Sequence, residues 1–173
     1  MLSRKELIFI RADALTDKEA FQFSKRLFME DNKIYWLIWE IGSSTGLRIS
    51  DVLNLSTKRI LSKSFYIKEI KTKKKKHIYI RQNILFEFIK YARENRLSGN
   101  DKAFKISRQT VWKKFKQTAK ECNIHKSIGT HTMRHTCAHH NIKKMGLKKL
   151  QKKLNHDRIT DTFFYTLENE ELE

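Results

Sequence analysis

Residues 34–39 read Ile-Tyr-Trp-Leu-Ile-Trp and form the longest uninterrupted apolar run of the chain. A helix that is apolar on every side is typical of one buried at the centre of a domain. The run is far too short to span a bilayer, which takes about 20 apolar residues. Residues 33–41 are therefore predicted to form a buried central helix that ends at the turn-forming residues 42–46.

The remaining apolar residues recur at spacings that predict more helices and one hairpin. Thr16 and Glu19 form a capping box, Asn83 and Ser107 are expected to cap two further helices, and Trp112 is expected to face inward. Other helices are predicted over residues 47–55, 131–145 (ended by Gly146), 147–154 and 160–165, and strands over 64–70 and 77–80. The predicted fold class is mainly α with a small antiparallel β-hairpin or sheet (α+β).

The charge of the chain is strongly basic. Its 173 residues hold 37 Lys and Arg against 19 Asp and Glu, a formal net charge of +18. Such a surface repels itself, and a polyanionic partner is the usual reason that the cost is tolerated. Nucleic acid is the leading partner, because phosphate neutralisation gives strong, salt-sensitive binding. An anionic membrane is less favoured, because no basic helix here carries a wide apolar face; a merely soluble basic protein is the remaining alternative.

The chain is expected to be one domain, with a lead-in over residues 1–15, a core over 16–165 and an acidic tail over 166–173. The N-terminus lacks the long apolar stretch of a secretory signal, and two cysteines cannot make a disulfide framework, so a cytoplasmic location is expected. Cys122-x-x-His125 and Cys137-x-His139 invite a zinc interpretation, but the second spacing is too tight and falls within a helix. No metal site is predicted.

Three segments place cationic and proton-transferring side chains about one helical turn apart. The first spans residues 45–51, the second 130–136, and the third 154–156 with a tyrosine nine positions later. The residues so placed are Arg48, Asp51, His131, Arg134, His156 and Tyr165. A lysine-rich stretch, residues 71–76, lies between the first two segments in the expected hairpin.

In these segments the sequence resembles the tyrosine recombinase family of the phage integrase type. Residues 45–52 match the family's box T-G-[LM]-R-x-[SG]-[ED]-[LV] at every position. Residues 131–138 match H-x-L-R-H-[ST]-x-A, with Met133 in place of the usual Leu. Residues 154–165 match L-G-H-x-x-I-x-x-T-x-x-Y, with Asn155 in place of the usual Gly. The order and spacing of the boxes hold over nearly the whole chain.

The resemblance implies DNA strand exchange through a 3′-phosphotyrosyl intermediate, with no metal or other cofactor. It implies that Tyr165 is the nucleophile and that Arg48 and Arg134 bind the phosphate oxygens. A phosphodiester is an anion that repels a phenolate, so fixed guanidinium groups are what this chemistry requires. Lys71, or Lys73 in its place, would protonate the departing 5′-oxygen.

Other residues have supporting roles by the same resemblance. His131 and His156 would bind the phosphate and assist proton movement, since either protonation state of an imidazole is accessible near neutral pH. Asp51 is expected to accept a hydrogen bond from Arg48 or His131. The lysines expected to hold DNA phosphates are Lys73, Lys74, Lys75, Lys76, Lys113 and Lys114.

The expected partner is double-stranded DNA, bound by a homotetramer on synapsed sites, with accessory DNA-binding proteins as further partners. The expected setting is a prokaryotic cytoplasm, with the gene carried by the host, a phage or a mobile element. Most family members carry an N-terminal clamp domain, and the fifteen residues before the first helix predict that it is missing here, so that the chain is either a minimal, invertase-like recombinase or a catalytic-domain fragment. Two alternatives stay open: a type IB topoisomerase-like enzyme and a non-catalytic DNA-binding protein.

Overall fold

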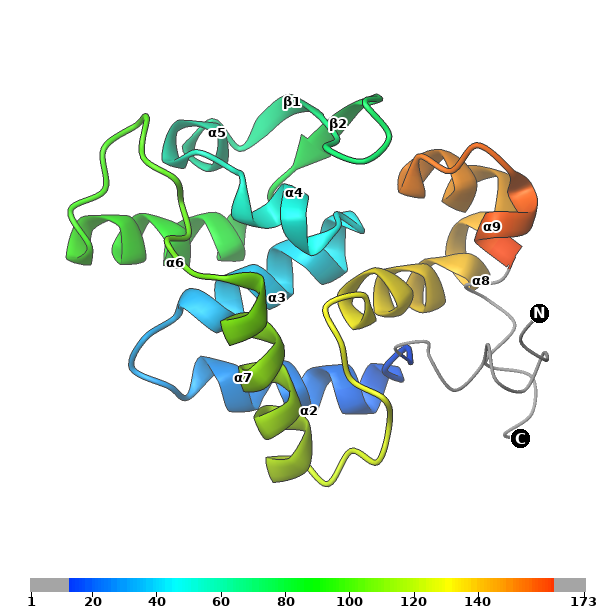
Figure 1. The fold of residues 1–173 in the computed structure, drawn as a ribbon, viewed down its shortest axis with the longest axis horizontal. Coiled ribbons are helices and arrows are strands. Elements are labelled where there is room, and N and C mark those ends of the chain that lie inside the picture. The colour runs from blue at the N-terminus through cyan, green and yellow to red at the C-terminus, as the bar shows by residue number, and fades with distance from the viewer. Residues whose placement is uncertain (1–12, 164–173) are drawn as a thin grey trace.

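The computed structural model describes residues 13–163, which fold into helices and one two-stranded sheet (Figure 1). The elements are α2 (Asp17–Phe28), α3 (Ile34–Thr45), α4 (Ile49–Leu53), α5 (Thr57–Leu61), β1 (Ser64–Lys68), β2 (Lys75–Tyr79), α6 (Gln82–Glu94), α7 (Arg108–Glu121), α8 (Thr132–Leu154) and α9 (Ile159–Phe163). This architecture confirms the predicted class, mainly α with one antiparallel hairpin. Tyr165, the acidic tail and most of the lead-in lie outside the described residues.

Helix α3 is the centre of the fold, as its apolar sequence predicts. It packs against α2, α6 and α8, and in Figure 1 it lies between the hairpin at the top and α2 at the bottom. Trp39 of α3 meets the rings of Phe23 and Phe115 at centroid distances of 4.5 and 5.6 Å. Aromatic pairs of this kind stabilise by about 1 kcal/mol each beyond the area they bury, so α2, α3 and α7 are held in one core.

The end of α3 differs from the prediction, because the helix continues through the turn formers to Thr45. Gly42 allows α8 to pack closely against α3, because a Cβ at this position would overlap Sδ of Met133 in α8. The hydroxyls of Ser44 and Thr45 donate to the carbonyls of Glu40 and Ile41, each at 2.5 Å, so they support the helix instead of ending it. Tertiary packing therefore outweighs the turn preference of this segment.

Other helix ends agree with the sequence in part. The capping box of Thr16 and the Ser107 cap are confirmed, with Ser107 accepting from the amide of Thr110 at 3.1 Å. The prediction for Asn83 is wrong, because α6 begins two residues earlier, after Arg81, which makes no side-chain cap. Trp112 is 41% exposed instead of facing inward. Helix α5 was not expected from the sequence.

The hairpin pairs β1 with β2 antiparallel, from Ser64 opposite Tyr79 to Lys68 opposite Lys75. Side chains alternate between the two faces of a strand, and here Ile67 and Ile78 are buried. The hairpin therefore rests one face on the core, at the top of Figure 1. Its turn, residues 69–74, faces the end of α8, where Nδ2 of Asn155 donates to Glu69 and Asp157 pairs with Lys74.

Helix α8 consists of two helical segments that meet at Gly146, where φ is 72° and ψ is 168°. This conformation suits glycine, and it confirms the predicted end of a helix at this residue. The bend lets Leu150 and Leu154 pack back on Ala138, which makes a small second apolar cluster. Within residues 13–163, no helix has both the length and the apolar character needed to cross a membrane.

Candidate active site

The first of the three boxes is positioned by the sharp end of α3. Gly46 ends the helix in the left-handed conformation (φ 68°), and a side chain there would lie 2.7 Å from Cδ2 of Leu154. The close approach brings residues 46 and 154 together, although they stand far apart in the chain. Arg48 follows as the N-cap of α4, with 14% of its side chain exposed.

The guanidinium of Arg134 joins all three boxes. Its Nη1 donates to the carbonyl of Gly46 at 2.6 Å, and its Nη2 donates to the carbonyl of Leu154 at 2.5 Å. Arg134 itself belongs to the second box, in the first half of α8, and its side chain is buried. Charge-assisted hydrogen bonds to two fixed carbonyls hold the guanidinium plane in one orientation.

A buried carboxylate lies between the two arginines. Oε1 of Glu69 is 3.4 Å from Nη1 of Arg48 and 3.9 Å from Nη1 of Arg134, so both guanidinium groups lie beside one atom. Glu69 is not among the site residues predicted from the sequence. A signal was present, because it is the one acidic residue between Asp51 and Glu87, in a hairpin otherwise rich in lysine.

The two histidines lie in the electrostatic field of the same cations. Loss of hydration lowers the pKa of His131, and the charges of Arg108, Arg134, Arg48 and Lys71 lower it further. Arg108, the first residue of α7, is therefore a second residue near the site, after Glu69, that was not predicted from the sequence.

His156 is affected more strongly. Burial lowers its pKa to about 4, and the charges of Arg134 and Arg48 act in the same direction. Its Nδ1 lies 2.9 Å from Oγ1 of Thr162 in α9, which orients the ring. The imidazole is therefore neutral at pH 7 in the free protein.

Asp51 and Lys71 differ in burial, because Asp51 is buried and Lys71 is exposed. The Asp51 carboxylate accepts no hydrogen bond from Arg48 or His131 among the described residues, contrary to the expectation; its Oδ1 accepts from the amide of Ile70 at 2.8 Å and ties α4 to the hairpin. Only the backbone amide of Asp51 bonds to Arg48, as it donates to that residue's carbonyl at 2.9 Å. Its Oδ2 is buried without a hydrogen-bond partner among the described residues. Lys71 is exposed in the hairpin turn, near enough for its charge to influence His131.

The six lysines expected to hold DNA phosphates are not equivalent. Lys73, Lys75 and Lys113 are exposed, which suits such a role. Lys74 and Lys114 pair with carboxylates, those of Asp157 and Glu30 respectively. These two are therefore less available to DNA than the sequence suggests.

Lys76 differs most from the expectation, because it is buried. Its Nζ donates to the carbonyl of Thr45 at 3.0 Å. Burial, with the charge of Arg134, lowers its pKa to about 8. Lys76 is thus a buried link between β2 and the end of α3, and not a surface contact for phosphate.

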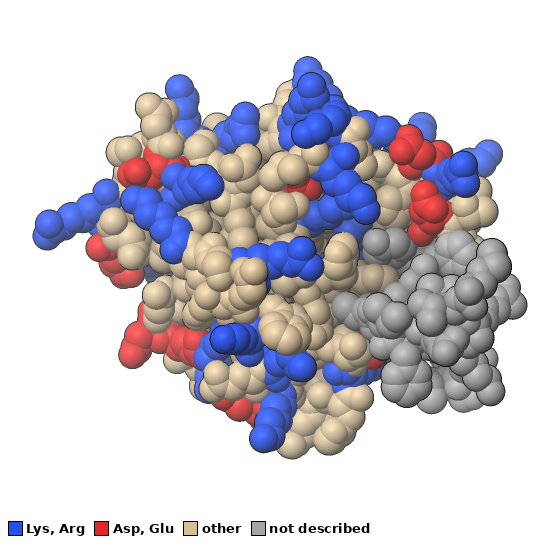
Figure 2. Space-filling view, viewed as in Figure 1, with Lys and Arg blue, Asp and Glu red and all other residues tan. Residues whose placement is uncertain are grey.

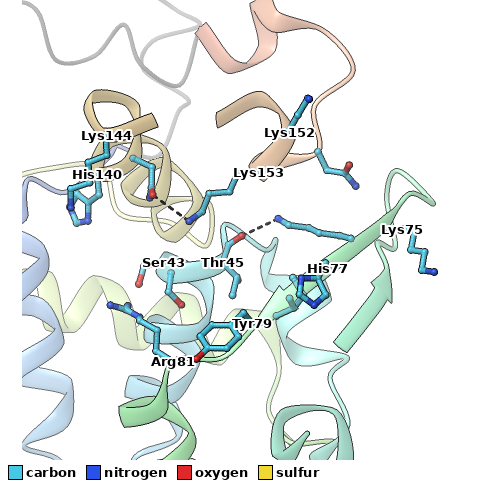
Figure 3. Close-up of a pocket in the computed structure, with 15 residues that line it drawn as sticks. Ser43, Thr45, Lys75, His77, Tyr79, Arg81, His140, Lys144, Lys152 and Lys153 are labelled. Atoms are coloured by element: carbon cyan, nitrogen blue, oxygen red, sulfur yellow. Dashed lines mark hydrogen bonds between the residues drawn. The ribbon is translucent and has the colours of Figure 1, made fainter. Parts of the chain in front are cut away.

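A basic cavity of about 740 Å³ opens beside this site, between α8, the end of α3 and β2 (Figure 3). Its described lining holds no Asp or Glu, and the Lys and Arg residues that line it are Lys75, Lys76, Arg81, Lys144, Lys152 and Lys153. In Figure 2, Lys and Arg side chains gather over the hairpin at the top of the molecule. Such a surface attracts a polyanion.

Metal ligands are not gathered in the part of the chain that the structure describes. Across residues 13–163, no group of three or more His, Cys, Asp or Glu side chains could hold an ion. Cys122 is half-buried and Cys137 is buried, and both are free thiols.

Comparison with known proteins identifies the family. The model of the phage integrase family matches residues 15–171. The probable integrase/recombinase YoeC of Bacillus subtilis is 31% identical over 156 residues, which cover 85% of this chain and 84% of that protein. The tyrosine recombinase XerD of Staphylococcus saprophyticus is 29% identical over 73% of this chain, which spans only 48% of that protein.

Solved structures agree on the fold. The catalytic domain of bacteriophage HP1 integrase superposes with a TM-score of 0.71 at 20% identity, over 90% of this chain and 87% of that one. A lambda integrase in a tetramer bound to a Holliday junction gives 0.69 at 18% identity, over 95% of this chain and 53% of that one.

The fold and the meeting of the three boxes define a tyrosine-recombinase catalytic domain. The chain belongs to the phage integrase family, and its class is that of the tyrosine-type site-specific recombinases.

Proposed function

We propose that this chain cuts and rejoins DNA at specific sites through a phosphotyrosyl intermediate, with Tyr165 as the nucleophile. One observation carries the proposal: Arg48 and Arg134, which come from boxes far apart in the chain, lie beside the same oxygen of Glu69. Two guanidinium groups at one point can bind the two non-bridging oxygens of a phosphodiester. Each fixed donor of this kind supplies about 3–4 kcal/mol of transition-state stabilisation.

In the proposed reaction the phenol oxygen of Tyr165 attacks the scissile phosphorus. The new bond joins Tyr165 to the 3′-phosphate, and the bond between phosphorus and the 5′-oxygen breaks. Lys71 gives its proton to that oxygen, while the phenol proton passes to a neighbouring base, for which His131 and His156 are the candidates. Because the intermediate keeps the phosphodiester energy, a new 5′-hydroxyl can reverse the steps without ATP.

We propose double-stranded DNA as the substrate and a homotetramer as the working assembly. The basic cavity and the hairpin cations support the first, since phosphate contacts dominate the affinity of proteins for DNA. The lambda integrase tetramer on a Holliday junction supports the second. Such a substrate, with bacterial relatives, suits a prokaryotic cytoplasm. Accessory proteins, a phage or mobile-element origin, and the division into lead-in, core and tail stay predictions.

A nicked suicide duplex tests the proposal, because loss of a short 5′ fragment prevents rejoining and traps the intermediate. We expect a covalent protein–DNA adduct that survives SDS and EDTA. Absence of any adduct with cognate duplexes, from a protein that binds them, would contradict the proposal.

The alternatives are distinguished by the products. A type IB topoisomerase-like enzyme would relax a supercoiled plasmid without recombinants, and a non-catalytic binding protein would give neither. The integrase and recombinase relatives favour recombinant products from a plasmid with two sites.

A further inference from the structure

Glu69 places a negative charge between the two arginines that are proposed to bind the DNA phosphate. The residue is fully buried, in the first position after β1. Its Oε2 accepts from Oγ1 of Thr72 at 2.8 Å and from Nδ2 of Asn155 at 3.0 Å. Its Oε1 faces Arg48 at 3.4 Å and Arg134 at 3.9 Å. A buried carboxylate is stable only when it is paired and hydrogen-bonded, and both conditions are met here.

These contacts connect four segments of the chain. Arg48 comes from the start of α4, Thr72 from the hairpin turn, Arg134 from α8, and Asn155 from the end of α8. Thr72 directly follows Lys71, so the carboxylate also ties the turn that carries this lysine. The backbone adds to the tie, since the amide of Lys73 donates to the carbonyl of Glu69 at 2.9 Å.

The two oxygens are held unequally. Oε2 has two short hydrogen bonds from neutral donors, whereas Oε1 lies at longer distances from the arginines. Neutral donors therefore hold the carboxylate more closely than the arginines do. A carboxylate that merely filled the phosphate position would instead take its short contacts from the arginines.

Asn155 is the hydrogen-bond partner of Glu69 that departs from the family's box. It adopts a left-handed conformation with φ 59°, which Asn tolerates better than most residues. The family's box has Gly at this position, and Gly suits the backbone but has no side chain. In this chain the amide side chain supplies a donor to Glu69.

We propose that Glu69, held by Asn155 and Thr72, is a positioning residue for strand cleavage: it orients Arg48 against Arg134 and holds the Lys71 turn over the phosphate. The inference rests on the proposed function. Two cations side by side repel each other, and an intervening carboxylate reduces that repulsion before the DNA arrives.

Glu69→Gln tests the inference by removing the charge while keeping the shape. We expect single-turnover cleavage of the suicide duplex to slow by about 10- to 100-fold, as for a misplaced catalytic group. The Kd for the duplex stays equal or falls, because a negative charge near the phosphate is lost. Slower cleavage with unchanged or tighter binding is a split that general destabilisation would not produce.

Asn155→Gly is the second variant, and it keeps the backbone conformation while removing the amide donor. We expect a smaller loss of cleavage rate, and a double variant with Glu69→Gln that is less than additive, as for residues that act through one contact. Glu87→Gln is the matched control, because this half-buried carboxylate pairs with Lys90 on α6. Its cleavage rate should equal that of the wild type.

NMR of the arginine side chains tests the same inference in the free protein, without DNA. Rotation of the Arg48 guanidinium should be slow in the wild type and fast in both variants. Wild-type rates of cleavage and unchanged Arg48 rotation in Glu69→Gln and Asn155→Gly would overturn the inference, as would faster cleavage by Glu69→Gln. If the wild type forms no adduct, the proposed function fails, while the rotation of Arg48 still reports on the role of Glu69.

Discussion

Arg134 shows how single side chains are specialised in this site. Two of its nitrogens are engaged by main-chain carbonyls, and the side chain is 1% exposed, so its position is set by the fold itself. Arg48 is less buried and has a carboxylate, not a carbonyl, beside its Nη1. The two guanidinium groups therefore differ in freedom: Arg134 is a fixed cation, and Arg48 depends on Glu69 for its orientation.

His156 leads to a prediction about pH. The folded protein holds its pKa at about 4, below the usual 6.5, so the unfolded chain binds this proton more readily. Folding stability should therefore fall as the pH drops from about 6.5 to about 4, with the contribution intact above 6.5. NMR titration of the His156 ring measures the midpoint directly.

Bound DNA should change that midpoint in a defined direction. A phosphate beside His156 favours the charged imidazole, so the pKa rises in the complex. The unfolded chain in denaturant is the control, with an ordinary midpoint. A free folded protein that titrates His156 at 6.5 would refute the burial argument.

At the scale of elements, the contact between α3 and α8 aligns the first two boxes. Gly42 of α3 lies against Met133, the residue before Arg134, with no room for a Cβ. The family's second box has Leu where this chain has Met. Close packing of these helices therefore sets the position of Arg134 relative to Gly46, the residue whose carbonyl accepts a hydrogen bond from Arg134.

Gly42→Ala tests this contact. Overlap with a buried side chain costs about 1–3 kcal/mol, against about 1 kcal/mol gained from helix propensity. We expect the free energy of unfolding to fall by up to about 2 kcal/mol, as measured by urea denaturation. Gly99→Ala is the control, because its Cβ would meet only Cβ of Lys58 at 3.6 Å. A Gly42→Ala protein at least as stable as the wild type would contradict the packing argument.

Local sequence predicted most elements, and its failures have physical reasons. The segment after Ile41 has the residues of a turn, yet contact with Met133 and hydroxyl-to-carbonyl hydrogen bonds keep it helical. Lys76 looks like any member of a lysine run, although it shares a strand face with the buried Ile78. That alternation was a signal for its burial.

The site was predictable where it depends on motifs and not where it depends on contacts. The boxes identified Arg48 and Arg134 because their spacing is distinctive. Glu69 lies outside every box, and its partners Thr72 and Asn155 become neighbours only in the folded chain. Asp51 was expected to accept a hydrogen bond from Arg48 or His131, but the partner of its carboxylate is an amide of the hairpin.

At the scale of the whole molecule, charge is distributed unevenly. The basic residues that line the cavity beside the arginines come from α8, β2 and the N-cap of α6 (Figure 3). Helices α2 and α7, which carry other lysines, lie below α3 in Figure 1. A net charge of +18 alone would bind DNA anywhere on the surface. The arrangement instead favours one face for the duplex.

The salt dependence of DNA affinity distinguishes binding at one face from binding anywhere on the surface. Each phosphate contact contributes a slope of about −0.9 to log K against log salt. Replacing Lys75, Lys144 and Lys152 of the cavity with Ala should reduce the magnitude of the slope by about 2–3. The same change at Lys25, Lys116 and Lys120, exposed on α2 and α7, should leave it nearly unchanged. Equal losses in the two triple variants would show that binding is not confined to one face.

Mass spectrometry of the trapped protein–DNA adduct tests the central claim most directly, because it identifies the residue that carries the nucleotide. The account predicts the modification on Tyr165 alone, no adduct in Tyr165→Phe, and a normal adduct in the control Tyr35→Phe. It also predicts that Arg134→Lys binds the duplex but forms the adduct at least about 100-fold more slowly. A nucleotide on any other residue, or an adduct that persists in Tyr165→Phe, would contradict it.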